Sequence, residues 1–264
     1  MKYDAYRIKS IEKAMHMLEL FSANQPELSL GELSKALGVH KSTAYRIAVT
    51  LVESGLLRWN PGKATYGLGL KILNLSSSLM NSLELRTQAR PYLEKLVSEV
   101  NETVHLAVLD QGEVVYIDKL EAVRGIRIFS DIGKRAPCHC TALGKVLLSE
   151  LPREKVRAIL ERKGMKCYTP NTITSVEEFL DHLEQVRQNG YALDLEEHEP
   201  LVYCIAVPIR DYSHQIIATL SMTMIIRDFS ENIFEQFIPV MLEAGANISR
   251  DMGYVAEQAE SSPV

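Results

Sequence analysis

A short polar stretch, "KSTAYRIAVT" from Lys41 to Thr50, carries side chains suited to hydrogen bonding with nucleic acid. Arginine and lysine bond to guanine edges or to phosphate oxygens, and short hydroxyl side chains can reach either. Two more cations follow at positions 58 and 63. The residues that we expect to contact DNA are therefore Lys41, Ser42, Thr43, Tyr45, Arg46, Thr50, Arg58 and Lys63.

The run Cys138-His139-Cys140 contains residue types that bind metal ions. Its C-x-C spacing matches no standard zinc pair, and on an extended segment His139 would point away from both cysteines. Cys204 and His198, elsewhere in the chain, could still join such a site. The simpler interpretation is two small, half-buried cysteines, so we predict no metal and no cofactor.

Cys204, His198 and Asp194 could also act as the nucleophile, base and orienting carboxylate of a hydrolase. Cys204, however, lies in the apolar run "VYCIAVPI", which has no glycine elbow to expose a nucleophile. A cysteine packed in a strand is the simpler interpretation, and we predict no catalytic residue. An enzyme in the C-terminal part of the chain remains the second hypothesis.

Apolar residues within the polar stretch recur at the spacing of an amphipathic helix, which leaves the polar candidates outside the buried stripe. A preceding helix begins at the capping box Ser29-x-x-Glu32 and ends near Gly38, and Ser10 is expected to cap an earlier one. Two helices joined by a short turn with glycine predict a helix-turn-helix, whose second helix enters the major groove. The buried stripe of that second helix is Ala44, Ile47, Ala48, Leu51 and Val52.

Two β-prone runs flank the turn Asn60-Pro61-Gly62-Lys63 and predict a two-stranded wing. Lys63 would lie at the tip with Arg58 beside it, where both cations can reach phosphate or the minor groove. The alternative is a small helical domain with a solvated polar face.

Charge is spread unevenly over the 264 residues. Residues 1–70 contain nine Lys or Arg and six Asp or Glu, a net charge of +3, while the remainder has 20 basic and 28 acidic residues, a net charge of −8. This asymmetry favours nucleic-acid binding by the N-terminal part. The four cysteines do not suggest a disulfide framework, and neither a secretory signal nor an apolar run of membrane length occurs, so we expect a cytoplasmic protein.

A helix over 70–85 is expected to link two domains. Its apolar face, with Ile72, Leu75, Leu79 and Leu83, could pack on a partner subunit or within the chain.

Beyond the linker, a hairpin around Gln111-Gly112 and strands at 125–133, 191–197, 202–211 and 215–226 alternate with helices, the last at 230–254. This order predicts an antiparallel sheet covered by helices, so the fold class is α+β. The expected domains are a DNA-binding domain at 1–69, a linker helix at 70–85, an effector domain at 86–255 and a disordered tail at 256–264.

Seven segments in order along nearly the whole chain resemble the IclR family of bacterial transcription regulators. They are "SIEKAMHMLELF", "LGVHKSTAYRIAVTLVESGLL", "YGLGLKILNL", "ETVHLAVLDQGEVVYIDKLE", "GKRAPCHCTALGKVLLS", "NGYALDLEEHE" and "CIAVPIRD". The resemblance implies a winged helix-turn-helix, a linker helix and a GAF-like effector domain for a small organic acid or an aromatic compound. The hairpin and the segments after it look most similar to family members that govern sugar-acid catabolism, which implies a sugar acid. It also implies repression as the usual sign, and homodimers that often pair into homotetramers.

Carried over by position, the family's effector pocket falls on eight residues. The start of a helix near Ala142 would offer free N–H groups to a carboxylate, and the hydroxyls of Ser221 and Thr223, two apart on a strand, would face one side. Asp194 could accept a hydrogen bond from a ligand hydroxyl. The eight residues are Gly125, Ile128, Ala142, Leu143, Asp194, Cys204, Ser221 and Thr223.

The chain departs from the family's usual glycines in "EPLVYC" and "RDYSHQ". The expected partners are double-stranded DNA with a palindromic operator, a small-molecule effector and further copies of the chain, but no membrane. A binding module that never contacts DNA is the third hypothesis.

Overall fold

The computed structural model describes residues 7–82, 84–122, 130–226 and 233–255. The chain divides into two compact units, Met1–Ser82 and Leu83–Val264, and each is described by itself. Within the described residues, no helix is long and apolar enough to cross a membrane.

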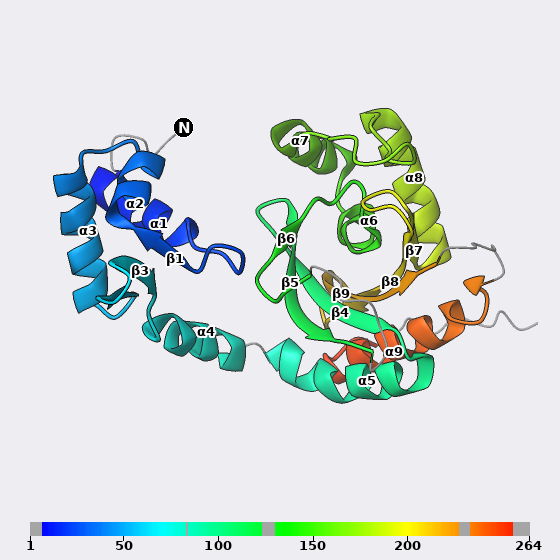
Figure 1. Cartoon of the computed structure of the whole chain (residues 1–264). Coiled ribbons are helices and arrows are strands. Elements are labelled where there is room, and N and C mark those ends of the chain that lie inside the picture. Colours follow the sequence, from blue (N-terminus) through cyan, green and yellow to red (C-terminus); the bar gives the residue numbers. More distant parts are fainter. Residues whose placement is uncertain (1–6, 83, 123–129, 227–232, 256–264) are drawn as a thin grey trace, which may run out of the picture. The chain divides into compact units, whose positions relative to one another are not determined.

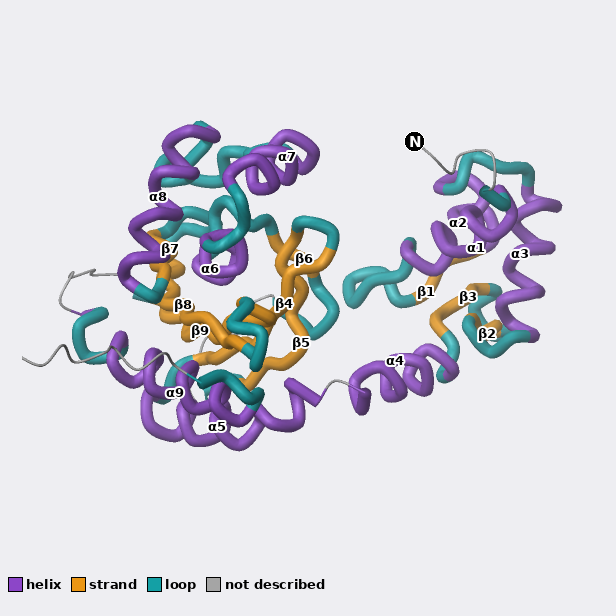
Figure 2. Tube along the Cα trace, turned by 180° about the vertical axis from the view of Figure 1, so that it is seen from behind, coloured by secondary structure: helices purple, strands orange, loops and turns teal. Residues whose placement is uncertain are grey.

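The first unit packs helices against a small antiparallel sheet of strand order β1-β3-β2 and continues into a further helix (Figure 2). Its core is formed by apolar side chains from the first three helices and the sheet, among them Met17, Leu33 and Ala48, all fully buried. The elements are α1 (Lys9–Glu19), β1 (Glu27–Ser29), α2 (Leu30–Ala36), α3 (Lys41–Glu53), β2 (Leu57–Asn60), β3 (Thr65–Leu68) and α4 (Lys71–Ser82).

The predicted helix-turn-helix and wing are confirmed. The capping box is present, because the Glu32 backbone N–H donates to the Ser29 hydroxyl at 3.3 Å and the Ser29 N–H donates to the Glu32 carboxylate at 2.7 Å. The capping role expected for Ser10 is wrong: α1 begins at Lys9 with Ile8 as its N-cap residue. Strand β1 was not predicted, because three residues are too short to show a period.

Helix α4 corresponds to most of the predicted linker helix. Leu75 is exposed, and Ile72 is half-buried. Leu79 and Leu83 lie outside the residues whose side chains are described, so both packing alternatives for this face remain predictions.

The second unit is a sheet of strand order β6-β5-β4-β9-β8-β7 with helices on both faces (Figure 1). All described strand pairs are antiparallel, which confirms the α+β class. The elements are α5 (Glu84–Val100), β4 (Thr103–Asp110), β5 (Glu113–Leu120), β6 (Arg135–Ala136), α6 (Ala142–Ser149), α7 (Arg153–Lys163), α8 (Val176–Asn189), β7 (Ala192–Leu195), β8 (Val202–Arg210), β9 (Ile216–Ile225) and α9 (Ile238–Asp251).

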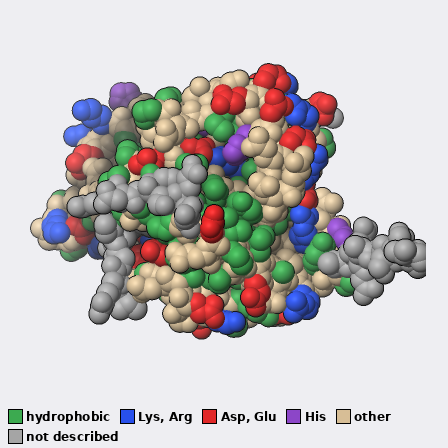
Figure 3. Space-filling model, turned by 90° about the vertical axis from the view of Figure 1, so that its right-hand side faces the viewer, with side chains coloured by type: hydrophobic (Ala, Val, Ile, Leu, Met, Phe, Trp, Pro, Cys, Tyr) green, Lys and Arg blue, Asp and Glu red, His purple; other side chains and the backbone are tan. Residues whose placement is uncertain are grey.

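The sheet separates two apolar cores. Alternate strand residues such as Val104 and Leu106 pack against α5 and α9, whereas Ala107 and Ala206 on the opposite face belong to the core with α6, α7 and α8. Strand β7 is an edge of the sheet. It lies on the side that Figure 3 presents, and on that side hydrophobic side chains gather at the centre with charged side chains around them.

Two local expectations differ from the structure. The strand predicted at 125–133 lies largely outside the described residues, and its described end, 130–133, is not a strand. The last helix begins at Ile238 instead of position 230. Leu201 (φ 65°) and His214 (φ 63°) adopt the left-handed conformation in the two segments that lack the family's glycines, at a steric cost that glycine would avoid.

Candidate functional site

Strand register gathers polar side chains on one face of the second unit's sheet. Directly opposed residues of neighbouring antiparallel strands point to the same face. One such row runs across four strands and consists of Thr103, Thr223, Cys204 and Asp194. The adjacent row includes His105, Ser221 and Ala206.

Helix α6 begins directly over these rows. Thr141 is its N-cap residue, and its hydroxyl accepts from the Gly144 N–H at 3.2 Å. In the described part of the chain no group accepts from the N–H of Ala142 or Leu143, so both remain free to bind a ligand. A Cβ on Gly144 would lie 2.2 Å from the Cys138 Cα, and this close packing fixes the start of the helix.

The sheet rows and the start of α6 enclose a pocket of about 60 Å³. Six of the eight residues expected from the resemblance line it, and the other two, Gly125 and Ile128, lie outside the described residues. The six are Ala142, Leu143, Asp194, Cys204, Ser221 and Thr223.

Ten lining residues were not predicted. His105 and Tyr116 lie on strands of the predicted hairpin, so alternation could have placed them on one face, and Thr141 could have been identified as a helix cap. His198 was considered only for a metal or hydrolase site, and no local pattern marks the remaining six. The full set of ten is His105, Tyr116, Ser130, Lys134, Arg135, Ala136, Thr141, His198, Glu199 and Val202.

Asp194 is the buried carboxyl group of the pocket, with 2% of its surface exposed. Burial raises its pKa to about 7, although the Glu197 backbone N–H donates to Asp194 Oδ1 at 2.8 Å and favours the ionised form. Asp194 therefore changes its charge near neutral pH, and an incoming ligand can displace that equilibrium in either direction.

His105, on β4, provides a neutral imidazole elsewhere in the pocket lining. Burial, followed by the charge of Lys119, lowers the pKa of His105 to about 3. Its Nε2 lies 2.7 Å from the Ser130 hydroxyl, and its Nδ1 lies 3.4 Å from the Thr223 hydroxyl. By contrast, the Ser221 hydroxyl has no hydrogen-bond partner among the described residues and faces the pocket.

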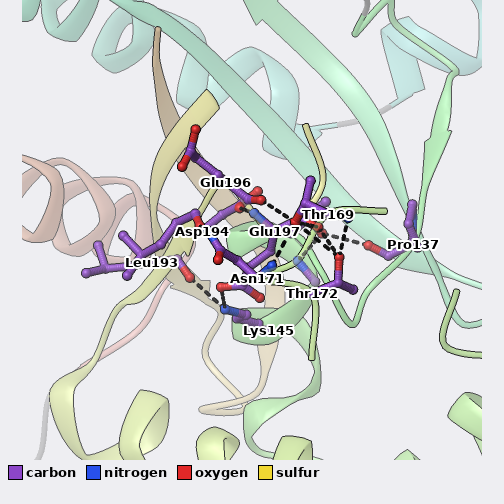
Figure 4. A network of polar contacts seen from close by, with 12 residues as sticks. Pro137, Lys145, Thr169, Asn171, Thr172, Leu193, Asp194, Glu196 and Glu197 are labelled. Atoms are coloured by element: carbon purple, nitrogen blue, oxygen red, sulfur yellow. Dashed lines mark hydrogen bonds and ion pairs between the residues drawn. The ribbon is translucent and has the colours of Figure 1, made fainter. Parts of the chain in front are cut away.

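A buried polar network supports the end of strand β7, which carries Asp194, and the residues that follow it (Figure 4). Lys145 of α6 is fully buried, donates to the Leu193 carbonyl at 2.8 Å and forms an ion pair with Glu197. The Thr172 hydroxyl donates to the Glu197 carbonyl at 2.6 Å. Because Glu197 also binds Asp194 through its backbone N–H, this network holds the pocket carboxyl group in place.

Three of the four cysteines, Cys138, Cys140 and Cys204, show the features of packed thiols, whereas Cys167 is exposed. Burial raises the pKa of Cys138 to about 12 and raises the pKa values of Cys140 and Cys204. His139 Nε2 lies 3.0 Å from the Lys166 carbonyl. Among the described residues, no group of three or more His, Cys, Asp or Glu side chains could hold a metal ion.

The hydrolase arrangement is likewise incomplete. Cys204, His198 and Asp194 line the same pocket, but the Cys204 thiol contacts the Thr223 hydroxyl at 3.3 Å, and no hydrogen bond joins it to His198 in the described structure. Burial lowers the pKa of His198, which weakens it as a base.

All six polar candidates on α3 are exposed. Tyr45 is 53% exposed, while Ala44 and Ala48 on the opposite side are fully buried. Thr43, Arg46 and Thr50 line an apolar groove between α3 and α1, and the other three candidates lie outside that groove. The helix therefore presents two polar edges instead of a single line.

The two wing cations already have a partner. Arg58 Nη2 lies 3.2 Å from Glu27 Oε1, and Lys63 Nζ lies 3.1 Å from Glu27 Oε2. Hydrogen bonds from Asn60, then from Lys63, lower the pKa of Glu27 to about 2, so the carboxylate is ionised at physiological pH. The predicted DNA contacts of the wing must compete with this pairing.

Two family models match the chain. Residues 10–61 match the IclR helix-turn-helix domain, and residues 77–250 match the bacterial transcriptional regulator IclR C-terminal domain. The chain is 36% identical over 249 residues to the HTH-type transcriptional regulator XynR of Escherichia coli, which covers 94% of this chain and 99% of the relative. It is 32% identical over 219 residues to the acetate operon repressor of Salmonella typhimurium, covering 82% and 80%.

A comparison with solved structures supports the same family. The crystal structure of an IclR homologue from Microbacterium hydrocarbonoxydans complexed with 4-hydroxybenzoate is 25% identical, covers 92% of this chain and 99% of that one, and has a TM-score of 0.81. Because the C-terminal model alone spans more than half of the residues, and relatives above 30% identity align over most of their length, the family is established. The chain belongs to the IclR family of bacterial transcriptional regulators.

Proposed function

We propose that this chain is a cytoplasmic homodimeric repressor whose operator binding is modulated by a small organic or sugar acid. The observation that carries the proposal is the pocket under α6, where free backbone N–H groups, a free hydroxyl and a buried carboxyl group converge in a domain attached to a winged helix-turn-helix. The acetate operon repressor among the relatives supports the sign of regulation, and the 4-hydroxybenzoate complex supports an acid as ligand.

For DNA, the exposed face of α3 is proposed to read base edges in the major groove. Arg46 can bond to guanine, and Ser42 and Thr43 are short enough to reach a base edge or a phosphate. Lys41 begins the helix, where its charge and the free N–H groups both suit a phosphate. A two-fold dimer would then prefer a palindromic site with half-sites about 10 base pairs apart.

For the effector, the carboxylate is proposed to bind the N–H groups of Ala142 and Leu143 at the positive end of α6. The Ser221 hydroxyl can donate a further hydrogen bond, since no described residue uses it. A hydroxyl group on the ligand can donate to Asp194, which would favour the ionised carboxyl group. An acid that also carries hydroxyl groups therefore satisfies both ends of the pocket, as a sugar acid does.

Effector binding can change operator affinity only if the effector prefers one arrangement of the dimer over another. We propose that it changes the spacing of the two DNA-binding units. The coupling free energy of such systems is about 1–3 kcal/mol, so a 5- to 150-fold change in operator affinity is the expected range.

The test is fluorescence anisotropy of the full-length protein on labelled duplexes that tile the DNA upstream of its own gene, at physiological salt, with a scrambled duplex as control. We expect tight binding to one tile and a change in that binding when a panel of sugar acids and aromatic acids is added. Salt-independent binding, or no preference for any tile with or without the acids, would contradict the proposal. Turnover of an acid by the protein would support the enzyme hypothesis instead.

A further inference from the structure

We propose that Glu27 is an internal counter-charge that limits the affinity of the wing for DNA by competing with phosphate for Arg58 and Lys63. This inference rests on the proposed DNA-binding role of the first unit. It concerns a residue of β1, a strand that the helix-turn-helix pattern does not include.

The Glu27 carboxylate accepts four hydrogen bonds, all from the wing. Its Oε1 accepts from Arg58 Nη2 at 3.2 Å and from Asn60 Nδ2 at 3.1 Å. Its Oε2 accepts from Lys63 Nζ at 3.1 Å and from the Thr65 hydroxyl at 3.3 Å. The donors lie on β2, on β3 and in the turn between them, so one carboxylate binds both strands and the turn.

Backbone register builds this arrangement. Glu27 pairs with Gly67 of β3, and Arg58 of β2 pairs with the same glycine from the other side. A Cβ at Gly67 would lie 3.2 Å from Arg58 Nη2 and 3.2 Å from the Pro26 carbonyl, so the absence of a side chain there leaves space for the guanidinium next to Glu27. The pairing is thus part of the sheet and not a chance contact of two long side chains.

The carboxylate and its two cations differ in how much of each side chain is exposed to solvent. The Glu27 side chain is 17% exposed, whereas those of Arg58 and Lys63 are 53% and 70% exposed. The cations can therefore meet a phosphate from outside while the carboxylate stays beneath them. Lys41 and Arg46 on α3, in contrast, form no ion pair with any described residue.

The charge balance predicts the consequence. Two cations and one ionised carboxylate leave the wing with a net charge of +1, enough for one phosphate instead of two. Phosphate contacts are independent of sequence, so Glu27 reduces binding to all DNA and leaves discrimination to α3. A substitution that removes the negative charge should allow the wing to form one further contact with a phosphate.

The test compares full-length wild type with Glu27→Gln in salt titrations on a labelled scrambled duplex. Each phosphate contact contributes about 0.9 to the slope of log K against log salt, so the slope should steepen by about 0.9 and affinity at physiological salt should rise about fivefold. Glu19→Gln is the control for charge: Glu19 lies on α1, and its ion pair is with His16. That variant should show no comparable change.

A second variant tests whether the gain in DNA affinity comes from the cations of the wing. Glu27→Gln combined with Lys63→Met restores the net charge of +1, so the slope and affinity should return to the wild-type values. Thermal unfolding of each variant checks that the fold is retained.

Unchanged or weaker binding by Glu27→Gln overturns the inference, with weaker binding meaning that Glu27 orients the wing for DNA. A gain that persists in the double variant overturns it as well, because the gain would not come from the wing cations. If the wild type itself shows no salt-dependent DNA binding, the proposed function fails instead, and the two failures are distinguishable.

Discussion

The two units present their polar groups in opposite ways. In the first unit the candidate contacts lie on the outside of one helix and one wing, and Tyr45 is 53% exposed. In the second unit they are buried before any ligand arrives: His105 and Asp194 are 2% exposed and Ser221 is 1% exposed. DNA is read from outside by hydrated side chains, whereas a small acid must be enclosed by groups that are already desolvated.

Burial changes the chemistry of the second unit. It raises the pKa of Asp194 to about 7 and lowers the pKa of His105 to about 3. Buried polar groups need partners, and the Lys145–Glu197 pair with its threonine hydrogen bonds meets most of that need behind the pocket, where Glu197 Oε2 alone of the pair has no partner among the described residues. The wing of the first unit uses the same type of pairing at the surface, around Glu27.

The largest effect that we predict is a loss of stability in the second unit that leaves the stability of the first unit unchanged. Lys145→Met leaves Glu197 buried without its cation, and breaking a buried pair in this way costs about 3–5 kcal/mol. Trp59, the single tryptophan, lies in the first unit, so its fluorescence follows that unit while circular dichroism follows both. Urea unfolding should show an early loss of helix signal with the tryptophan transition unchanged.

The matched control is Lys145→Met with Glu197→Gln, which removes the unpaired charge and should recover much of the lost stability. If the single variant lowers the unfolding free energy of the second unit by less than about 1 kcal/mol, the buried network does not support the pocket as described.

The second prediction concerns pH. Because the folded pKa of Asp194 is raised, the folded protein binds more protons than the unfolded one between about pH 4 and 7, and this contribution to stability is lost as pH rises through that window. Relative to Asp194→Asn, the wild type should therefore lose up to about 4 kcal/mol across the window, since one pKa unit corresponds to about 1.4 kcal/mol.

Histidines with lowered pKa values, such as His105 and His182, act in the opposite direction, but they are present in both proteins and cancel in the difference. Asp211→Asn is the control of opposite sign: hydrogen bonds from Ser213 lower the Asp211 pKa, so the wild type gains stability with rising pH. If the difference in unfolding free energy between the wild type and Asp194→Asn does not change with pH, Asp194 is not held as a buried acid.

The third prediction tests the exposed site. Arg46→Ala should weaken operator binding by about 1–3 kcal/mol if Arg46 contacts a base, with little change in stability because its side chain is exposed. Lys35→Ala, which removes an exposed cation from α2, should leave the ratio of operator to scrambled-duplex affinity unchanged. If Arg46→Ala keeps the wild-type ratio of operator to scrambled-duplex affinity, base recognition by this residue is excluded.

The smallest effect is expected inside the pocket. Ser221→Ala removes one hydrogen bond to the effector, worth about 1 kcal/mol or a fivefold loss of affinity by calorimetry. Operator binding without effector should stay at the wild-type level, as it should for the exposed control Ser98→Ala. Wild-type effector affinity in Ser221→Ala would remove this hydroxyl from the proposed contacts.

Local patterns predicted much of the first unit. Ser29 and Glu32 are three residues apart, and Gly38 takes the left-handed conformation (φ 63°) that the turn requires. The same approach failed for β1, whose three residues show no period, and for Glu27, whose partner Lys63 is 36 residues away. In the second unit the resemblance supplied six lining residues, while His105 and Ser130 were missed because only the tertiary fold places them 2.7 Å apart.

The sequence by itself determined the helix-turn-helix, the wing and the α+β class, because helix caps, turns and apolar periods depend on residues a few positions apart. It also identified the family, through the seven segments that resemble it. Only the tertiary structure decided the enclosure and charge of the pocket. Lys145 and Glu197 are 52 residues apart, and strand register across β8 places Asp194 and Thr223 in one row on the same face of the sheet. Such contacts follow from register and burial, since long-range pairing aligns side chains that no local spacing relates.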